Sequence, residues 1–360
     1  MVPSGAIVRD VRKIAVLRSN ALGDMIFVLP ALEALRAAYP GAEIVLLAKE
    51  WHAAFWQDRP GPVDRVIVVP PSIGVNSPPG AAVTENPVEL ARFFAAMSAE
   101  RFDLALQLHG GGRYSNPFVQ RLGARITAGL KTPDASPLDR WLPYIYFQPE
   151  ILRYLETVAL VGAQPVTLEP RLVLTAADCA EAARVVPHTS RPLVALHPGA
   201  GHPTRRWPPE HFAAVADALV AAGADVVVIG TEPERAITEA VMAAMQQPAR
   251  NLCGQLALGG LAGLLSRCAV FIGNDSGPLH LAGAVGAATV GIFWCANLIN
   301  AEPLTRTRHH PLLSWQLHCP VCGRNTVHDP CTHPVSLVAN VPVNEVVAAA
   351  RDLLARGTHG

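Results

Sequence analysis

The chain has 360 residues, half of them hydrophobic, and its 29 basic and 29 acidic side chains cancel. This length predicts two domains, and the balanced charge argues against a protein that binds nucleic acid. The sequence has no apolar run of about 18 residues that would span a membrane. It also lacks the basic start and apolar stretch of a secretory signal, so we expect a cytoplasmic protein.

The N-terminal half alternates strand and helix signals. Short apolar, β-branched runs predict buried strands at 13–18, 43–48, 65–69 and 104–108. Apolar residues at helical spacing predict helices at 25–38, 89–99 and 151–161. Residues 71–88 and 132–150 are rich in turn-forming residues and are interpreted as irregular. This β-α-β order predicts a parallel sheet with right-handed crossovers.

The same alternation restarts after residues 165–192, which carry little strand signal and hold the expected linker. Strands are predicted at 193–197, 225–229, 270–273 and 289–293. Helices are predicted at 209–222, 234–245, 261–266, 277–285 and 343–355. We therefore predict an α/β protein with Rossmann-like domains at 1–170 and 190–340, and a helix within 341–360 that packs back on the N-terminal domain.

Ligands of open parallel sheets bind beyond the carboxyl ends of the strands. This rule selects the loops at 19–24, 109–113, 197–207, 230–232 and 273–277. Two such sheets would bring loops from both domains to a shared cleft.

Asp24 ends the first of these loops, where a helix is expected to begin. One interpretation is an N-cap, because a helix N-terminus stabilises a carboxylate. The other is a general base that takes a proton from an acceptor hydroxyl. The two roles are compatible.

The segment 273–280 reads Gly-Asn-Asp-Ser-Gly-Pro-Leu-His and joins a strand to a helix. Proline suits a first helical turn, and the free N–H groups of that turn can hold a phosphate. The alternative is a capped helix without a ligand.

The segment 197–207 combines a glycine-rich turn with Thr204, Arg205 and Arg206. Guanidinium groups bind phosphate in a forked geometry, so this turn is a candidate diphosphate site; the alternative is a solvated basic turn. Glu232 could accept hydrogen bonds from ribose hydroxyls, or it could be an ordinary surface residue. The absence of GxGxxG, Walker and GxSxG motifs argues against dehydrogenases, kinases and hydrolases.

Three motifs together resemble the heptosyltransferase family, glycosyltransferase family nine. They are Arg-Ser-Asn-Ala-Leu-Gly-Asp at 18–24, His-Pro-Gly-Ala at 197–200 with Arg-Arg-Trp-Pro at 205–208, and Gly-Asn-Asp-Ser-Gly-Pro-Leu-His-Leu-Ala at 273–282. The resemblance spans about residues 13–355. It implies a GT-B fold and inverting, metal-independent transfer of a heptose from ADP-heptose to the inner core of lipopolysaccharide, with peripheral association at the inner membrane.

The resemblance also implies roles for residues. Asp24 takes the general-base position, and Arg205 stands where the family usually has a phosphate-binding lysine. The donor-binding positions of the C-terminal domain are Thr204, Arg205, Arg206, Glu232, Asp275, Ser276, Gly277 and His280. The N-terminal domain would bind the acceptor, with Arg113 and Arg121 as candidates. Alternatives are a GT-B transferase for another nucleotide sugar or a protein acceptor, and a non-catalytic nucleotide-sugar-binding paralogue.

A late segment, 318–333, contains three cysteines and three histidines. Cys319, Cys322 and Cys331, with a histidine as fourth ligand, could hold a structural zinc or iron ion. Related family members that glycosylate autotransporter proteins carry a cysteine-bound iron in a comparable region. The alternative is a reduced, cysteine-rich loop, and no metal is required for catalysis.

Overall fold

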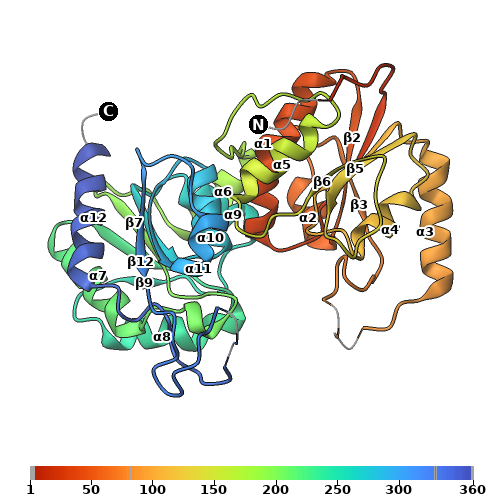
Figure 1. The fold of residues 1–360 in the computed structure, drawn as a ribbon. Coiled ribbons are helices and arrows are strands. Elements are labelled where there is room, and N and C mark those ends of the chain that lie inside the picture. Colours follow the sequence, from red (N-terminus) through yellow and green to blue (C-terminus); the bar gives the residue numbers. More distant parts are fainter. Residues whose placement is uncertain (1–4, 79, 81–82, 328, 330, 358–360) are drawn as a thin grey trace. The chain divides into compact units, whose positions relative to one another are not determined.

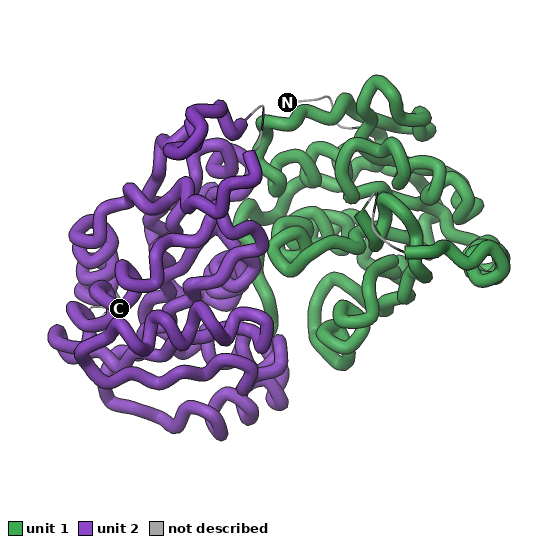
Figure 2. The backbone as a smooth tube through the Cα atoms, turned by 90° about the horizontal axis from the view of Figure 1, so that it is seen from below, with its two compact units in different colours: residues 1–173 green, residues 174–360 purple. Residues whose placement is uncertain are grey.

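The computed structural model describes all residues except 1–4, 79, 81–82, 328, 330 and 358–360. The chain divides into two compact units, residues 1–173 and residues 174–360 (Figure 2). Each unit is built on one six-stranded sheet whose strands all pair in parallel (Figure 1).

Unit 1 places its strands in the order β3-β2-β1-β4-β5-β6. The strands are β1 (Lys13–Leu17), β2 (Glu43–Ala48), β3 (Arg65–Val68), β4 (Leu104–Gln107), β5 (Ile126–Lys131) and β6 (Arg140–Pro143). The helices are α1 (Leu22–Ala38), α2 (Glu50–Trp56), α3 (Pro87–Glu100), α4 (Ser115–Gln120) and α5 (Glu150–Ala159). Alternate strand residues such as Ala15 and Leu17 pack with Phe94 of α3 and Phe118 of α4, which buries that face of the sheet.

Unit 2 places its strands in the order β12-β11-β10-β7-β8-β9. The strands are β7 (Leu193–His197), β8 (Asp225–Val228), β9 (Arg250–Asn251), β10 (Val270–Asn274), β11 (Ala288–Trp294) and β12 (His309–Ser314). The helices are α6 (Ala176–Val185), α7 (Pro209–Ala221), α8 (Arg235–Ala244), α9 (Leu258–Leu265), α10 (Gly277–Ala284), α11 (Cys295–Ala301) and α12 (Val343–Gly357), with short 3-10 turns η1 (Pro203–Arg205) and η2 (Glu232–Glu234).

The two sheets share one topology. Counted along the chain within each unit, both have the Rossmann order 3-2-1-4-5-6. The strand order therefore reverses between β1 and β4 in unit 1 and between β7 and β10 in unit 2. Ligands of such sheets bind at this switch point, so the loops that follow these four strands are expected to form the binding site.

The eight strands predicted from sequence are all present, and the predicted α/β class with two Rossmann-like sheets is confirmed. One region predicted to be irregular, 132–150, contains the edge strand β6. The expected linker region at 165–192 has no strand and includes the boundary between the two units, but it also contains helix α6, which was not predicted. Thr175 and Asp178 cap α6 reciprocally through their side chains and backbone N–H groups at 3.2 and 2.8 Å.

The C-terminal helix also departs from expectation. We expected it to pack back on the N-terminal domain, but α12 lies against α7 and the sheet of unit 2 (Figure 1). Val346, Ala350 and Leu353 of α12 are buried in the core cluster of that unit, which explains the placement. None of the helices in the described part of the chain is both long and apolar enough to cross a membrane.

Candidate active site

The turn that follows β7 is held in place by Trp207 and Asn274. The Trp207 backbone N–H donates to Asn274 Oδ1 at 3.0 Å, and Asn274 Nδ2 donates to the Pro198 carbonyl at 2.9 Å. The fully buried Trp207 ring donates to the Val341 carbonyl at 3.1 Å. The glycine-rich turn after β7 is therefore fixed against β10, its neighbour across the switch point.

Asp275, which directly follows β10, is the centre of a buried polar network. Its carboxylate lies 3.1 Å from Arg205 Nη1, 3.2 Å from His280 Nε2 and 3.0 Å from Asn297 Nδ2. Burial raises the pKa of Asp275. Its three partners outweigh burial and hold this pKa below its usual value: His280 through a hydrogen bond and its charge, Arg205 through its charge, and Asn297 through a hydrogen bond. Asp275 is thus a carboxylate that orients Arg205, whose guanidinium has further N–H donors for an anion.

A second chain of polar contacts runs from Ser276 to the loop after β8. His197 Nδ1 lies 3.2 Å from Ser276 Oγ, and His197 Nε2 lies 3.4 Å from Glu234 Oε2. Burial raises the pKa of Glu234, but its partners lower this pKa to about 2. His197 acts through a hydrogen bond and its charge, and Thr231 acts through hydrogen bonds from its N–H and hydroxyl groups. A Cβ added at Gly199 would lie 1.9 Å from Glu234 Oε1, so only glycine allows this carboxylate to approach the turn.

The first turn of α10 carries no side-chain cap. Pro278 lies in this turn and Ser276 is the N-cap residue, yet the Ser276 hydroxyl donates to the Asn274 carbonyl instead of capping the helix. Asp275 uses its carboxylate for Arg205, His280 and Asn297. The capped-helix alternative from the sequence is therefore not what the structure has, and the helix start can receive an anion.

A pocket of about 220 Å³ lies next to this network. We call it the Arg205 pocket. It is lined by His202, Thr204, Arg205, Trp294, Asn297, Thr326, Cys331, Val335 and Leu337.

The remaining predicted donor residues differ in their surroundings. Thr204 lines the Arg205 pocket, and Gly277 opens α10. Arg206 donates from Nε to the Ala200 carbonyl at 3.1 Å, so it supports the turn. Glu232 is an exposed partner of Arg235, with Oε1 2.8 Å from Arg235 Nη2.

In unit 1, Asp24 is at the third position of α1, and the N-cap residue is Ala21, which corrects the N-cap assignment. Asp24 Oδ2 accepts the Ala21 N–H at 3.0 Å. Its Oδ1 accepts from Arg18 Nη2 at 2.8 Å, and Arg18 also donates to the Leu108 carbonyl at 2.8 Å. Arg18 therefore joins the loops after β1 and β4 at the switch point of this sheet.

Two neutral histidines lie beside Arg18. His109 Nδ1 accepts the Ser19 N–H at 3.2 Å, and His52 Nδ1 accepts the Lys49 N–H at 3.3 Å. Burial, with the positive charges of Arg18 and Lys49, lowers the pKa of each histidine to about 3. Lys49 directly follows β2 and so stands at the same edge of the sheet as Asp24.

The two predicted acceptor arginines lie at different edges of unit 1. Arg113 follows β4, at the carboxyl edge with Asp24; its side chain is exposed and lies 3.6 Å from Asp134. Arg121 follows α4, where the chain returns to the start of β5, and its guanidinium packs over the Phe94 ring. The structure therefore groups Arg113 with Asp24, but not Arg121.

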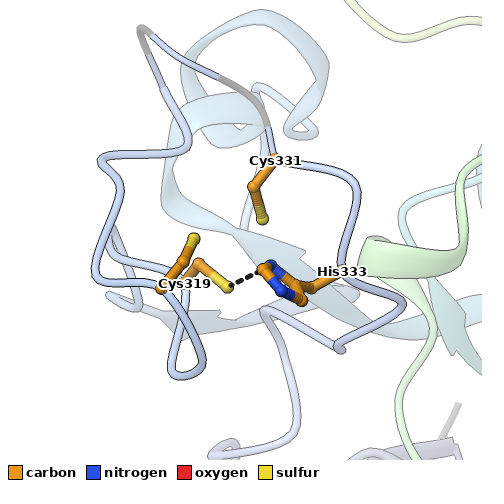
Figure 3. Close-up of side chains that lie close together, drawn as sticks. Cys319, Cys331 and His333 are labelled. Carbon is orange, nitrogen blue, oxygen red and sulfur yellow. Dashed lines mark hydrogen bonds between the residues drawn. The ribbon is translucent and has the colours of Figure 1, made fainter.

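The late cysteine segment brings four possible metal ligands together. Ligand atoms of Cys319, Cys322, Cys331 and His333 all lie within 4.8 Å of one another; we call them the Cys/His tetrad. Figure 3 shows Cys319, Cys331 and His333 pointing toward one another, with Cys319 Sγ 3.7 Å from His333 Nδ1. Thiolate sulfur and imidazole nitrogen are atom types that bind zinc and iron in proteins. His328, the second histidine of the segment, lies outside the described residues.

The backbone around Cys319 supports a metal-binding role. The Val321 N–H lies 3.4 Å from Cys319 Sγ, and Gly323 donates to the Cys319 carbonyl at 2.9 Å with a left-handed φ of 72°. The N–H groups of Cys322 and Val321 lower the pKa of Cys319 to about 6, which favours the thiolate. The cysteines are free thiols, so no disulfide competes with the tetrad for its ligands.

The sequence model of glycosyltransferase family 9 (heptosyltransferase) matches residues 90–327, more than half of the chain. The chain belongs to this family. The match confirms the resemblance seen in the three motifs and identifies the chain as a glycosyltransferase. It includes the motifs at 197–208 and 273–282, whereas the Asp24 motif precedes the matched residues.

Individual relatives extend over most of this family 9 chain. The lipooligosaccharide heptosyltransferase 2 of Haemophilus ducreyi is 24% identical over 76% of this chain and 80% of its own. The solved Escherichia coli ADP-heptose lipopolysaccharide heptosyltransferase II is 20% identical, with a TM-score of 0.74 over 96% of this chain and 99% of its own. The iron-containing heptosyltransferase TibC of enterotoxigenic E. coli is 14% identical, with a TM-score of 0.55 over 97% of this chain and 80% of its own. The GT-B fold predicted for this family 9 enzyme agrees with these structures.

Several residues of the candidate site were missed from sequence. Glu234 and Asn297 have no local motif that separates them from surface residues, because their partners are distant in the chain. Lys49 could have been found, since it follows a predicted strand and the carboxyl-edge rule applies there too.

Proposed function

We propose that this family 9 glycosyltransferase transfers a heptose from ADP-heptose to a hydroxyl of the lipopolysaccharide inner core, with inversion and with Asp24 as general base. The names of its relatives support this donor and this acceptor. Unit 2 binds the donor and unit 1 binds the acceptor in this proposal.

The observation that carries the proposal is the Asp275 network beside the Arg205 pocket. A buried carboxylate holds Arg205 at the switch point, with the uncapped start of α10 in the next residues of the chain. A guanidinium and the backbone N–H groups of Ser276 and Gly277 are suited to the diphosphate of a nucleotide sugar. Thr204, Asp275, Ser276, Gly277 and His280 complete the proposed donor site, with Arg206 holding its turn; Glu232 is proposed only as a ribose contact.

The proposed reaction is a single displacement. The acceptor oxygen forms a bond to the anomeric carbon while the bond from that carbon to the diphosphate oxygen breaks. The hydroxyl proton passes to Asp24, and ADP leaves with the bonding electron pair. Arg205 and the backbone N–H groups of Ser276 and Gly277 stabilise the charge that develops on the diphosphate.

On the acceptor side, we assign Arg113 as a contact for anionic groups, because it shares the carboxyl edge of the sheet with Asp24. The Cys/His tetrad is proposed to hold a structural zinc or iron ion. It takes no part in the displacement, which needs no cofactor.

The decisive experiment compares variants for transfer and for ADP binding. Asp24→Asn keeps one oxygen, for either the Ala21 N–H or Arg18, so we expect a lower stability in a variant that still folds, an unchanged ADP affinity, and a turnover about 10²–10⁴-fold lower. Arg205→Ala should instead weaken ADP binding about tenfold or more, as expected for a lost charged hydrogen bond. Asp58→Asn is the control, because Asp58 is exposed with a φ of 55°, which asparagine tolerates.

The donor is tested with ADP-heptose against UDP- and GDP-sugars. Turnover with ADP-heptose alone supports the proposal. Normal turnover by Asp24→Asn would exclude this residue as the base, and a preference for UDP- or GDP-sugars would exclude the donor.

A further inference from the structure

The Cys/His tetrad and the Arg205 pocket are built by the same loop. Thr326, Cys331, Val335 and Leu337 line the pocket, and all four lie in the segment 315–337, which contains the tetrad. Cys331 belongs to both sets. The position of this metal-ligand side chain therefore affects the shape of the pocket wall.

The same segment is hydrogen bonded to the glycine-rich turn that follows β7. The Leu337 N–H donates to the Thr204 carbonyl at 2.7 Å, and Thr204 directly precedes Arg205. At the other end, Trp294 Nε1 donates to the Gln316 carbonyl at 2.8 Å. A movement of the segment would thus be passed to Thr204 and Trp294, which also line the pocket.

Besides short-range hydrogen bonds, such as those of the Thr326 N–H to the Leu317 carbonyl at 2.8 Å and of the Cys319 N–H to the Arg324 carbonyl at 2.9 Å, little holds the segment in one conformation. Between 315 and 336 the described residues include no helix or strand, only an isolated bridge between His318 and Asn325. Trp315 and Val321 are 72% and 63% exposed, so these large apolar side chains add little buried surface. Coordination of one ion by the four side chains would stabilise the segment in place of a hydrophobic core, because the free energy of metal binding offsets the entropy lost when the loop is ordered.

We propose that an ion in the Cys/His tetrad fixes the wall of the Arg205 pocket, so that metal and nucleotide bind cooperatively. This inference rests on the proposed function, since it takes the Arg205 pocket as part of the donor site. Coupling between two sites is reciprocal. The metal should therefore tighten ADP binding, and ADP should slow the loss of the metal.

The test uses the full chain, with Zn²⁺ and ADP as the probes. Metal analysis of fresh protein is followed by calorimetric ADP titrations of Zn²⁺-loaded and chelator-treated protein. We expect one ion per chain and a Kd for ADP about tenfold lower with Zn²⁺, within the usual range of such couplings. We also expect saturating ADP to slow the extraction of Zn²⁺ by a chelator.

Variants separate the tetrad from other thiols. Cys322 is an exposed member of the tetrad and does not line the pocket, so its side chain is not expected to contact the nucleotide. Cys322→Ser should therefore lose the ion and, as an indirect effect, bind ADP about tenfold more weakly. Cys322→His restores a zinc ligand and should recover part of both properties. The control is Cys179→Ser, a change of an exposed cysteine on α6, which should behave like the parent. Circular dichroism shows whether each variant keeps its fold.

The outcomes distinguish the two proposals. An ion that binds while the Kd for ADP stays within twofold overturns the coupling, and so does a chain that binds neither Zn²⁺ nor iron. Failure of the Zn²⁺-loaded parent to bind ADP overturns the donor assignment, and the coupling with it.

Discussion

Arg18 Nη2 donates to Asp24 Oδ1 at 2.8 Å from a side chain that is only 2% exposed, whereas the Asp24 side chain is 34% exposed. Arg18 also donates from Nε to the Asp24 carbonyl at 3.1 Å and stacks over the Tyr154 ring, 4.6 Å from its centroid. Oδ1 of the proposed base is thus held by a buried cation and Oδ2 accepts the Ala21 N–H, while about a third of the Asp24 side chain stays exposed.

This geometry makes Arg18 a positioning residue. We expect Arg18→Met, which keeps the volume but removes every donor, to lower kcat/KM about 10–100-fold and to cost about 2–4 kcal/mol of unfolding free energy. Arg18→Lys keeps the charge and should recover part of the activity. Arg59→Met is the control, because Arg59 is a buried arginine outside the site that donates to the Phe55 and Val173 carbonyls. Equal kcat/KM losses in both arginine→methionine variants would mean that Arg18 is merely structural.

The glycine-rich turn offers a matched pair of substitutions. Gly199→Ala places a Cβ 1.9 Å from Glu234 Oε1, whereas the nearest atom to a Cβ at Gly201 is Arg205 Nη2 at 3.6 Å. We expect Gly199→Ala to lose about 1–3 kcal/mol of stability through overpacking and to weaken ADP binding. Gly201→Ala should leave both properties nearly unchanged. Calorimetry and urea unfolding measure them, and an ADP affinity unaffected by Gly199→Ala would show that this turn does not hold the donor.

A second pair of substitutions, Glu234→Gln and Glu232→Gln, compares the partly buried Glu234 with the exposed Glu232. The pKa of Glu234 is about 2 in the folded chain against 4.5 for a free glutamate. Its ionised form therefore stabilises the fold above about pH 4.5, and this contribution is lost as the pH falls through 2. Glu234→Gln should cost about 1–2 kcal/mol at pH 7 and almost nothing near pH 2. Glu232→Gln should change stability by less than about 0.5 kcal/mol, and a weaker Kd for ADP in this variant would reveal the ribose contact predicted from sequence.

Most strands could be predicted where the sequence has a short run of β-branched and other apolar residues. β1, β2 and β7 consist almost wholly of buried apolar residues, so composition alone identified them. β12 was missed because its sequence, His-His-Pro-Leu-Leu-Ser, is half-buried and starts with polar residues. β6 was missed because it ends in a proline at the sheet edge, where proline is tolerated.

The site shows a similar division. Arg205, Asp275 and His280 were found because they follow strands, and a local rule covers that position. The contact between Arg205 and Asp275 joins residues 70 positions apart and depends on β7 pairing with β10. Pairing also explains Arg121, which looked like a partner of Arg113 in the sequence but lies beyond α4 at the other edge of the sheet.

The buried histidines of unit 1 predict acid sensitivity. The pKa of His52 is about 3 in the folded chain, because of burial and the charges of Lys49 and Arg18, against about 6.5 when unfolded. Below pH 6.5 the unfolded chain takes up a proton that the folded chain refuses, so stability falls by up to about 1.4 kcal/mol per pH unit until pH 3. His52→Gln should therefore gain about 2 kcal/mol relative to the parent between pH 6 and pH 4. Urea unfolding across this range measures the gain, with the exposed His188→Gln as control; parallel pH profiles for parent and His52→Gln would refute a neutral, buried His52.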